Sequence, residues 1–426
     1  MKSLVALVSL SLFSWGTLSA NCTLPPQPKS FAQWCQQQKS LPVATQKTIA
    51  ALLKEAGTSK CQLAEAKLSR LKNLNLSFAE ISDLRPLASL NNLTSLNLNS
   101  NQITDLQPLN GLNQLESLLL TKNQISDLRP LSALNKLTRL DLDSNQIIDI
   151  QPLARLRNLT TLEMNFNQIN NIQPLSGLIR LTKLWLDNNQ ITDIQPLSRL
   201  NKLTEVELNG NQLKDLQPIA NLTNLTTLWL GFNQITDIQK LANLRNLNKL
   251  YLQGNSIEDL QPLTSLRQLS VLNLHQNKIT NIQPLANLPA LKIFDLSDNQ
   301  IQNLQPLTKM NQLQELNLGS NKISDARSLT SLSRLTELYL DNNQINDVQP
   351  LDNLKNLTIL DLSNNRVNNI QPLASLNGLN YLNLDQNQIK DLKSLAGLNS
   401  LDYLYINTNP ISTKVCPLRA SSTCKF

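Results

Sequence analysis

Residues 93–114 read LTSLNLNSNQITDLQPLNGLNQ, and the same pattern returns in every following block of 22 residues. Within each block, three apolar residues, nearly always leucine, precede an asparagine, which is Asn101 here and recurs in the same register up to Asn409. An earlier block, residues 71–92, carries Ala79 in place of this asparagine. The chain therefore contains sixteen coils of one repeated unit, with no insertion between them.

The spacing of apolar and polar residues predicts one strand and one turn in each coil. Leu-x-Leu alternation is typical of a short strand whose intervening residues face outward. The asparagine follows the strand, and its amide both donates and accepts hydrogen bonds. We therefore expect it to satisfy buried backbone groups of its own and neighbouring coils. Asp105 and Asn171 occupy one equivalent position two residues after the isoleucine, which indicates a turn-capping acceptor.

A single coil cannot bury its own apolar positions, so the coils must stack on one another. Pro108 and its equivalents direct a turn onto the side opposite the strands, where 22 residues leave room for 3₁₀ turns rather than full helices. The sequence therefore predicts an α/β solenoid, curved as a right-handed superhelix. A parallel β-sheet would line its concave face, 3₁₀ turns its convex face, and helices its N-terminal end.

The first twenty residues are typical of a secretory signal peptide. A basic residue precedes an apolar run over residues 4–13, which is too short to span a bilayer. Small residues end at Ala20, so we predict a signal peptide over residues 1–20 and a mature chain that begins at Asn21. Cys22 leaves a lipoprotein as an alternative, although Asn21 separates this cysteine from the cleavage point.

The segments outside the repeats are predicted to cap the two ends of the stack. Residues 21–70 form the predicted N-terminal cap, in which apolar residues at helical spacing and the helix-stopping Gly57 indicate two or three short helices. The repeats are assigned to residues 71–412, and residues 413–426 are the predicted C-terminal cap.

Five cysteines lie in these terminal segments and none lies in the repeats. Export would permit disulfides. We predict the pairs Cys35–Cys61 and Cys416–Cys424, which leaves Cys22 without a partner. No CxxC motif or Cys/His zinc spacing is present in the sequence.

The unit NQITDIQPL, as at residues 189–197, resembles the leucine-rich repeats of bacterial internalins. It is also similar to the related 22-residue class that includes a phosphatase-1 regulatory subunit. The resemblance covers about residues 71–412 and implies a solenoid that serves as a binding module. Internalins also combine a signal peptide with a helical cap. They usually continue into an immunoglobulin-like domain and a wall anchor, and no LPxTG-like signal follows the last coil here.

The outward strand positions, five in each coil, would form the concave face. All five tyrosines and both tryptophans of the repeats fall at these positions. Exposed aromatic side chains on a rigid sheet are typical binding hot spots, although an aromatic ladder that only stiffens the sheet is an alternative. The predicted partner-binding site is centred on Trp185, Glu207, Trp229 and Tyr251, which share one strand position in successive coils. Its predicted flanking residues are Glu163, Phe166, Asp187, Glu205, Phe232 and His275. A second candidate towards the C-terminus comprises Tyr339, Tyr381, Tyr403 and Tyr405.

Charge is divided between the faces. The concave positions hold fifteen acids and six bases, a net charge of 15 negative minus 6 positive, or −9. The whole chain has a net charge of +7, so all other positions sum to +16. A negative binding face would repel phosphate, which disfavours nucleic acid as the partner.

The sequence contains no motif that indicates catalysis. His275 is the only histidine, and we find no Gly-rich phosphate loop, metal-ligand cluster or nucleophile elbow. Glu205 and Glu207 are the residue type that glycosidases use, but a repeat face offers no deep cleft. We therefore predict no enzyme, no cofactor and no bound metal.

These patterns favour a secreted or periplasmic, monomeric protein that binds a protein partner on its concave face. A glycan-binding or cell-wall-binding protein is the first alternative, and a structural envelope protein is the second. We expect no transmembrane segment and no nucleic-acid partner.

Overall fold

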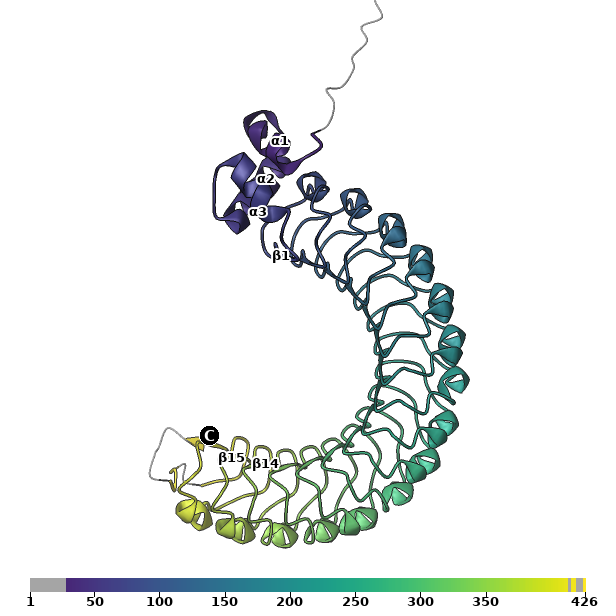
Figure 1. The fold of residues 1–426 in the computed structure, drawn as a ribbon. Coiled ribbons are helices and arrows are strands. Elements are labelled where there is room, and N and C mark those ends of the chain that lie inside the picture. The colour runs from purple at the N-terminus through teal and green to yellow at the C-terminus, as the bar shows by residue number, and fades with distance from the viewer. Residues whose placement is uncertain (1–27, 413–414, 419–423) are drawn as a thin grey trace, which may run out of the picture.

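The computed structural model describes residues 28–412, 415–418 and 424–426. The predicted signal peptide, the predicted mature start at Asn21 and Cys22 lie outside these residues. The chain forms a single arc with strands along its inner side and 3₁₀ turns along its outer side (Figure 1). Three helices lie at the N-terminal end of the arc, and the last strands lie at the other end.

Each coil contributes a three-residue strand, and neighbouring strands pair in parallel with a constant shift of 22 residues. The strands are β1 (Asn73–Asn75), β2 (Ser95–Asn97), β3 (Ser117–Leu119), β4 (Arg139–Asp141), β5 (Thr161–Glu163), β6 (Lys183–Trp185), β7 (Glu205–Glu207), β8 (Thr227–Trp229), β9 (Lys249–Tyr251), β10 (Val271–Asn273), β11 (Ile293–Asp295), β12 (Glu315–Asn317), β13 (Glu337–Tyr339), β14 (Ile359–Asp361), β15 (Tyr381–Asn383), β16 (Tyr403–Tyr405) and β17 (Cys424–Lys425). The predicted parallel sheet is confirmed, and β17 extends it by a strand that the repeat does not predict.

The convex side carries a 3₁₀ turn in each coil from η2 (Arg85–Leu87) to η16 (Lys393–Gly397), as predicted. The acceptor before each turn also has its predicted role. Asp105 Oδ1 accepts the backbone N–H of Gln107 at 2.8 Å, and Asn171 Oδ1 accepts that of Gln173 at 2.9 Å. Because either an acid or an amide oxygen can accept this bond, aspartate and asparagine interchange at the position.

The core consists of leucine and isoleucine columns that run through the stack. Leu118, Leu140 and Leu162 occupy the middle of successive strands and are fully buried. One departure is Phe294 in the same column, which is 1 % exposed. Aliphatic columns of one size keep the coils identical in thickness, which explains why aromatic residues are scarce in the core.

The recurrent asparagine holds consecutive coils together through its side-chain amide. Asn233 Nδ2 donates to Leu208 O of the preceding coil at 2.9 Å and to Leu230 O of its own coil at 3.1 Å. Its Oδ1 accepts the backbone N–H of Leu213, also in the preceding coil, at 3.0 Å. Its Nδ2 also donates to Gly231 O of its own coil at 3.1 Å. The predicted role of this residue is therefore confirmed, because its amide serves both its own coil and the coil before it.

This direction explains why the first coil lacks the asparagine. Asn101 Nδ2 donates to Leu76 O at 2.9 Å, and Asn101 Oδ1 accepts the N–H of Ile81 at 3.1 Å. The second coil thus satisfies the backbone of the first. Ala79 can occupy the equivalent position because no coil precedes it.

The N-terminal cap comprises α1 (Phe31–Gln36), α2 (Val43–Ala56) and α3 (Cys61–Leu68), with a short 3₁₀ turn, η1 (Gln38–Ser40). α2 ends at the predicted Gly57, whose φ of +60° lies in the left-handed region that glycine tolerates. The cap docks on the first coil at Asp83, where Thr48 Oγ1 donates to the backbone carbonyl oxygen at 2.7 Å. Arg85 of that coil pairs with the Asp83 carboxylate at 2.7 Å and lies over the Trp34 ring.

Both predicted disulfides, Cys35–Cys61 and Cys416–Cys424, are present, with Cα–Cα distances of 5.6 and 5.7 Å. The first ties α1 to α3. The second holds β17 to the segment that precedes it, and the Ile406 N–H donates to Lys425 O at 2.9 Å. The last coil, which no further asparagine follows, is therefore hydrogen-bonded by the C-terminal segment instead.

Replacement of the ladder asparagine should cost far more stability than replacement of its exposed neighbour. Asn233→Ala leaves four backbone groups without this partner and should lower the free energy of unfolding by about 1–3 kcal/mol. Gln234→Ala is the matched control, because the Gln234 side chain is exposed. Urea denaturation measures both variants, and equal midpoints for the two would contradict this role of the ladder.

Candidate functional site

The register of the sheet brings the central predicted residues into one column. The third residues of β5 to β9 are Glu163, Trp185, Glu207, Trp229 and Tyr251, and each pairs with the next across adjacent strands. The Trp229 and Tyr251 rings stack, with centroids 5.2 Å apart and planes 2° from parallel. The structure thus forms a continuous column of alternating carboxyl and aromatic groups on the inner side of the arc.

Trp185 is fixed in place by its neighbours on the next strand. Its Nε1 donates to Glu205 Oε1 at 3.1 Å, and Lys183 Nζ pairs with Glu205 Oε2 at 3.0 Å. Both oxygens of Glu205 are therefore engaged within the sheet. The indole face, rather than the Glu205 carboxylate, is the group that this part of the column presents.

Two carboxyl groups of the column are desolvated. Burial raises the pKa of Glu207 to about 8, and repulsion from Asp187 and Glu205 adds to the effect. Burial and the nearby Asp141 raise the pKa of Glu163 to about 7, although Arg139 opposes the change. A raised pKa favours the protonated form of Glu207, and its carboxyl group hydrogen-bonds the Asp187 carboxylate from a position between two tryptophans.

An acidic cluster, which we define as Asp141, Asp143 and Glu163, adjoins this column on β4 and β5. Their carboxylate oxygens lie within 4.8 Å of one another, and Asp141 and Glu163 are 7 % and 5 % exposed. Arg139 Nη2 pairs with Glu163 Oε1 at 3.0 Å and already supplies one positive charge. All-oxygen groups of this kind suit hard cations such as Ca²⁺. Burial raises the pKa of Asp143 to about 6.

Sequence reasoning missed Asp141 and Asp143 as candidate site residues. The spacing of 22 between Asp141 and Glu163 is the signal that places them on adjacent strands. No metal-ligand motif of the ordinary kind accompanies them, because the grouping arises between coils rather than within one.

Asp187 has a structural partner in the next coil. Its Oδ1 accepts the backbone N–H of Asn209 at 2.6 Å, and its Oδ2 accepts from Asn209 Nδ2 at 2.9 Å. Asn165 Oδ1 in turn accepts the N–H of Asp187 at 2.6 Å. These bonds form a second polar ladder beside the asparagine ladder, so the Asp187 carboxylate supports the loop after the strand.

Phe166 and Phe232 lie at the edge of the concave face, immediately before the ladder asparagine. They are 58 % and 53 % exposed, and their φ angles of +55° and +53° lie in the left-handed region, which is unfavourable for bulky residues. A Cβ at Gly254 would lie 2.4 Å from Phe232 Cδ1, so the glycine makes room for this ring. Phe78, 78 % exposed at the equivalent place in the first coil, was not among the predicted residues.

His275 and the C-terminal tyrosines lie farther along the arc. His275 Nδ1 lies 2.8 Å from Ser297 Oγ and 3.4 Å from Asp298 Oδ2. Tyr381 and Tyr405 lie on adjacent strands with ring centroids 5.5 Å apart, and Tyr403 pairs with Tyr381 in the register.

Tyr339 is separate from these tyrosines, because two strand steps divide β13 from β15. It donates to Glu337 Oε2 at 3.0 Å, and burial together with this bond raises the pKa of Tyr339 to about 12. The structure therefore brings together three of the four residues of the second candidate.

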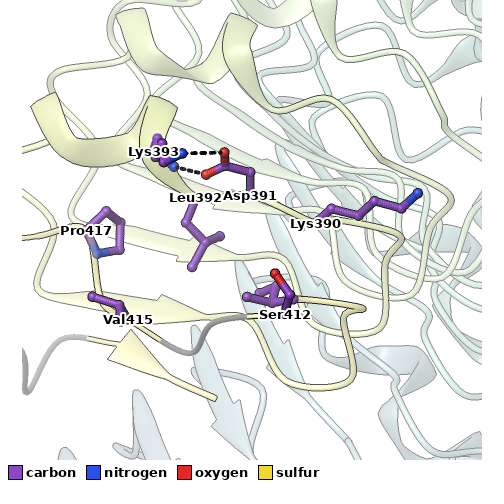
Figure 2. Close-up of a pocket in the computed structure, with 8 residues that line it drawn as sticks. Lys390, Asp391, Leu392, Lys393, Ser412, Val415 and Pro417 are labelled. Atoms are coloured by element: carbon purple, nitrogen blue, oxygen red, sulfur yellow. Dashed lines mark hydrogen bonds and ion pairs between the residues drawn. The ribbon is translucent and has the colours of Figure 1, made fainter.

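A pocket of about 350 Å³ lies at the end of the solenoid, away from the aromatic column (Figure 2). Lys390, Asp391 and Lys393 line one side, and Val415 and Pro417 of the C-terminal segment line the other. Lys393 Nζ pairs with Asp391 at 3.5 Å, whereas Lys390 forms no ion pair with any residue that the structure describes.

Models of leucine-rich repeats match nearly all of the coiled region. The two-copy model matches residues 69–111, 113–155, 157–199, 201–243, 245–287 and 333–375. A second leucine-rich-repeat model matches residues 267–323, 289–345 and 355–411. The chain belongs to the leucine-rich-repeat family. No match was found among curated proteins.

Solved leucine-rich-repeat structures are similar over most of the chain. An internalin, InlF, from Listeria monocytogenes is 32 % identical, with a TM-score of 0.65, over 80 % of this chain and 98 % of its own. A leucine-rich-repeat protein of Leptospira interrogans is 28 % identical, with a TM-score of 0.76, over 82 % and 92 %. The ectodomain of the plant receptor kinase GASSHO1/SCHENGEN3 from Arabidopsis thaliana shares the fold at 21 % identity, with a TM-score of 0.59, over 81 % and 54 %.

The resemblance to the 22-residue internalin-like class is therefore confirmed. Leucine-rich-repeat proteins of the internalin and receptor-ectodomain types are generally protein-interaction modules, and the fold is a recognised non-enzymatic scaffold. Within the residues that the structure describes, no helix is long and apolar enough to cross a membrane.

Because of the buried carboxyl groups, we expect the free energy of unfolding to fall as the pH rises from about 5 to about 8. Their pKa values exceed the usual 4.5 of glutamate, so the folded chain binds more protons than the unfolded chain over this range. The slope is at most about 1.4 kcal/mol per pH unit for each proton involved. Asp83, Asp127 and Asp325, whose pKa values are lowered, titrate below this window.

Urea denaturation at a series of pH values measures this slope. Glu207→Gln should make it shallower, since glutamine resembles the protonated acid. An unchanged slope in Glu207→Gln would show that this group is not desolvated.

Proposed function

We propose that the protein is an interaction module whose concave face binds a protein partner at a central site. The central site comprises Glu163, Trp185, Glu207, Trp229 and Tyr251, with Phe166 and Phe232 at its edge. The stacked Trp229–Tyr251 pair is the observation that carries the proposal. It places large, rigid aromatic surface on the concave sheet face, beside carboxyl groups whose pKa values stay raised by burial.

The acids indicate what such a partner would supply. Glu163 and Glu207 would gain from a cation or an amide that approaches them, because either would relieve their raised pKa values. A protein segment with a basic side chain between apolar ones would match the alternation along the column. Asp187 and Glu205 would not contact the partner but would position other residues. Asp187 holds Asn209 in place, and Glu205 holds Trp185.

A glycan remains the second candidate, favoured by the same stacked rings. Sugar rings stack on aromatic faces, and the protonated Glu207 could hydrogen-bond their hydroxyl groups. We propose binding without turnover in either case.

We also propose that the protein acts outside the cytoplasm as a monomer. Its internalin-like neighbours and its two disulfides support an exported protein. Mass spectrometry of the exported chain would test the proposed cleavage, which predicts a mature N-terminus at Asn21. Retention of residues 1–20, or a lipid on Cys22, would contradict it.

Trp229→Ala should weaken binding strongly while leaving the fold intact. Peptides selected from a phage-displayed random library against the wild-type protein provide the probe. Loss of a hot-spot tryptophan should weaken their affinity at least about thirtyfold. The free energy of unfolding should fall by no more than about 1.5 kcal/mol, the contribution of one aromatic pair.

Phe78→Ala is the matched control, since Phe78 is an exposed aromatic residue of the first coil. It should keep full affinity. Intact binding by Trp229→Ala, together with a loss of several kcal/mol of stability, would instead make the column a structural ladder. Retention on a glycan array without selection of any peptide would favour the second candidate.

A further inference from the structure

One rim of the arc carries positive charge without any acid. We define the basic rim as the two residues that precede the first leucine of each coil from the second to the sixteenth, from residues 91–92 to residues 399–400. None of these positions holds Asp or Glu. Eight hold an exposed base: Lys136, Arg157, Arg180, Lys202, Arg245, Arg267, Arg334 and Lys355.

The fold places these residues in a column along one side of the stack. They lie where each coil returns from its 3₁₀ turn to the next strand. Side chains join rim positions of adjacent coils: Arg180 Nη1 donates to Asn158 Oδ1 at 2.8 Å, and Arg334 Nη1 donates to Gln312 Oε1 at 2.7 Å. Asn158 Nδ2 in turn donates to Asn135 O at 2.7 Å. The bases therefore follow one another along an ordered surface.

The aspartates that precede the 3₁₀ turns have a structural role that explains their charge. Asp105, Asp149 and Asp193 each accept the backbone N–H two residues ahead and cap a 3₁₀ turn. By contrast, none of the eight rim bases forms an ion pair with any residue that the structure describes. Their positive charge is therefore uncompensated, although Arg180 and Arg334 donate hydrogen bonds to amide oxygens of the preceding coil.

We propose that the basic rim is a docking surface for an anionic lipid membrane. The rim follows the curve of the arc, which Figure 1 shows face-on. An extended anionic surface can meet bases of several neighbouring coils together, whereas a stiff linear polyanion cannot follow the curve of the arc. Five of the eight bases are arginines, whose planar fork suits phosphate oxygens.

The composition of the rim also separates a membrane from single-stranded nucleic acid. No aromatic residue occupies any rim position, so the rim offers no platform on which bases could stack. Ile179, 59 % exposed beside Arg180, is an apolar residue that can enter the headgroup region. Docking on this rim leaves the acidic concave face open to its partner, so the inference stands independently of the proposed function.

Vesicle sedimentation tests this inference on the whole protein. It should bind vesicles of phosphatidylcholine with phosphatidylglycerol, bind them less as salt is raised, and ignore pure phosphatidylcholine. Each base near such a surface contributes about fivefold in affinity. The quadruple variant Arg157→Gln, Arg180→Gln, Arg245→Gln, Arg267→Gln should therefore bind at least tenfold more weakly.

A second quadruple variant removes the same charge from the concave face. Lys72→Gln, Lys122→Gln, Lys249→Gln, Lys292→Gln changes exposed bases of the strand positions and should bind the vesicles as the wild-type protein does. Equal losses in the two variants would show that net charge alone acts and would overturn the inference. Failure of the wild-type protein to bind anionic vesicles would overturn it as well.

Two further arms complete the test. Binding to duplex DNA or dextran sulfate at a salt concentration where vesicles are not bound would assign the rim to a soluble polyanion and refute the membrane. If the rim variant fails to show the wild-type unfolding transition, the double variant Arg245→Glu, Arg267→Glu replaces it, with the same expected loss of at least tenfold.

Discussion

The side-chain amide of the ladder asparagine is the interaction on which the rest of the structure depends. Asn189 Nδ2 donates to Met164 O at 3.0 Å, and its Oδ1 accepts the Ile169 N–H at 3.0 Å, both in the preceding coil. The bond therefore has a direction along the stack, and the two ends are not equivalent. Backbone groups of the first coil are hydrogen-bonded by the second coil, whereas the last coil is hydrogen-bonded by the C-terminal segment with its disulfide.

The asparagine ladder supplies hydrogen-bond partners for the backbone from inside the stack. The outward-facing strand positions are therefore free to vary. The leucine columns and the asparagine fix the register, and neither constrains what Trp229 or Glu207 presents. The column can therefore hold desolvated carboxyl groups, whose cost is small against sixteen coils of buried leucine. The concave acids and the rim bases occupy different faces for the same reason, because each face of the solenoid is formed by its own positions in the repeat.

The period of 22 made much of this structure predictable from the sequence. It placed Glu163, Trp185 and Trp229 in one column, because a constant shift between strands decides which residues are neighbours. It could not show that Asp187 is bonded to Asn209, since side-chain rotamers depend on the curvature of the sheet and not on its period. Nor could it reveal β17, which lies beyond the repeat, or the acidic cluster at Asp141, whose burial depends on neighbours in other coils.

The central claim is that a partner binds where carboxyl and aromatic groups alternate in the middle of the arc. Hydroxyl-radical footprinting with a selected peptide bound tests it most directly, because tryptophan and tyrosine report their own exposure. The account predicts protection of Trp185, Trp229 and Tyr251, with Tyr381, Tyr403 and Tyr405 labelled as in the free protein. Protection confined to the C-terminal tyrosines, or unchanged labelling of Trp229 at saturating peptide, would contradict it.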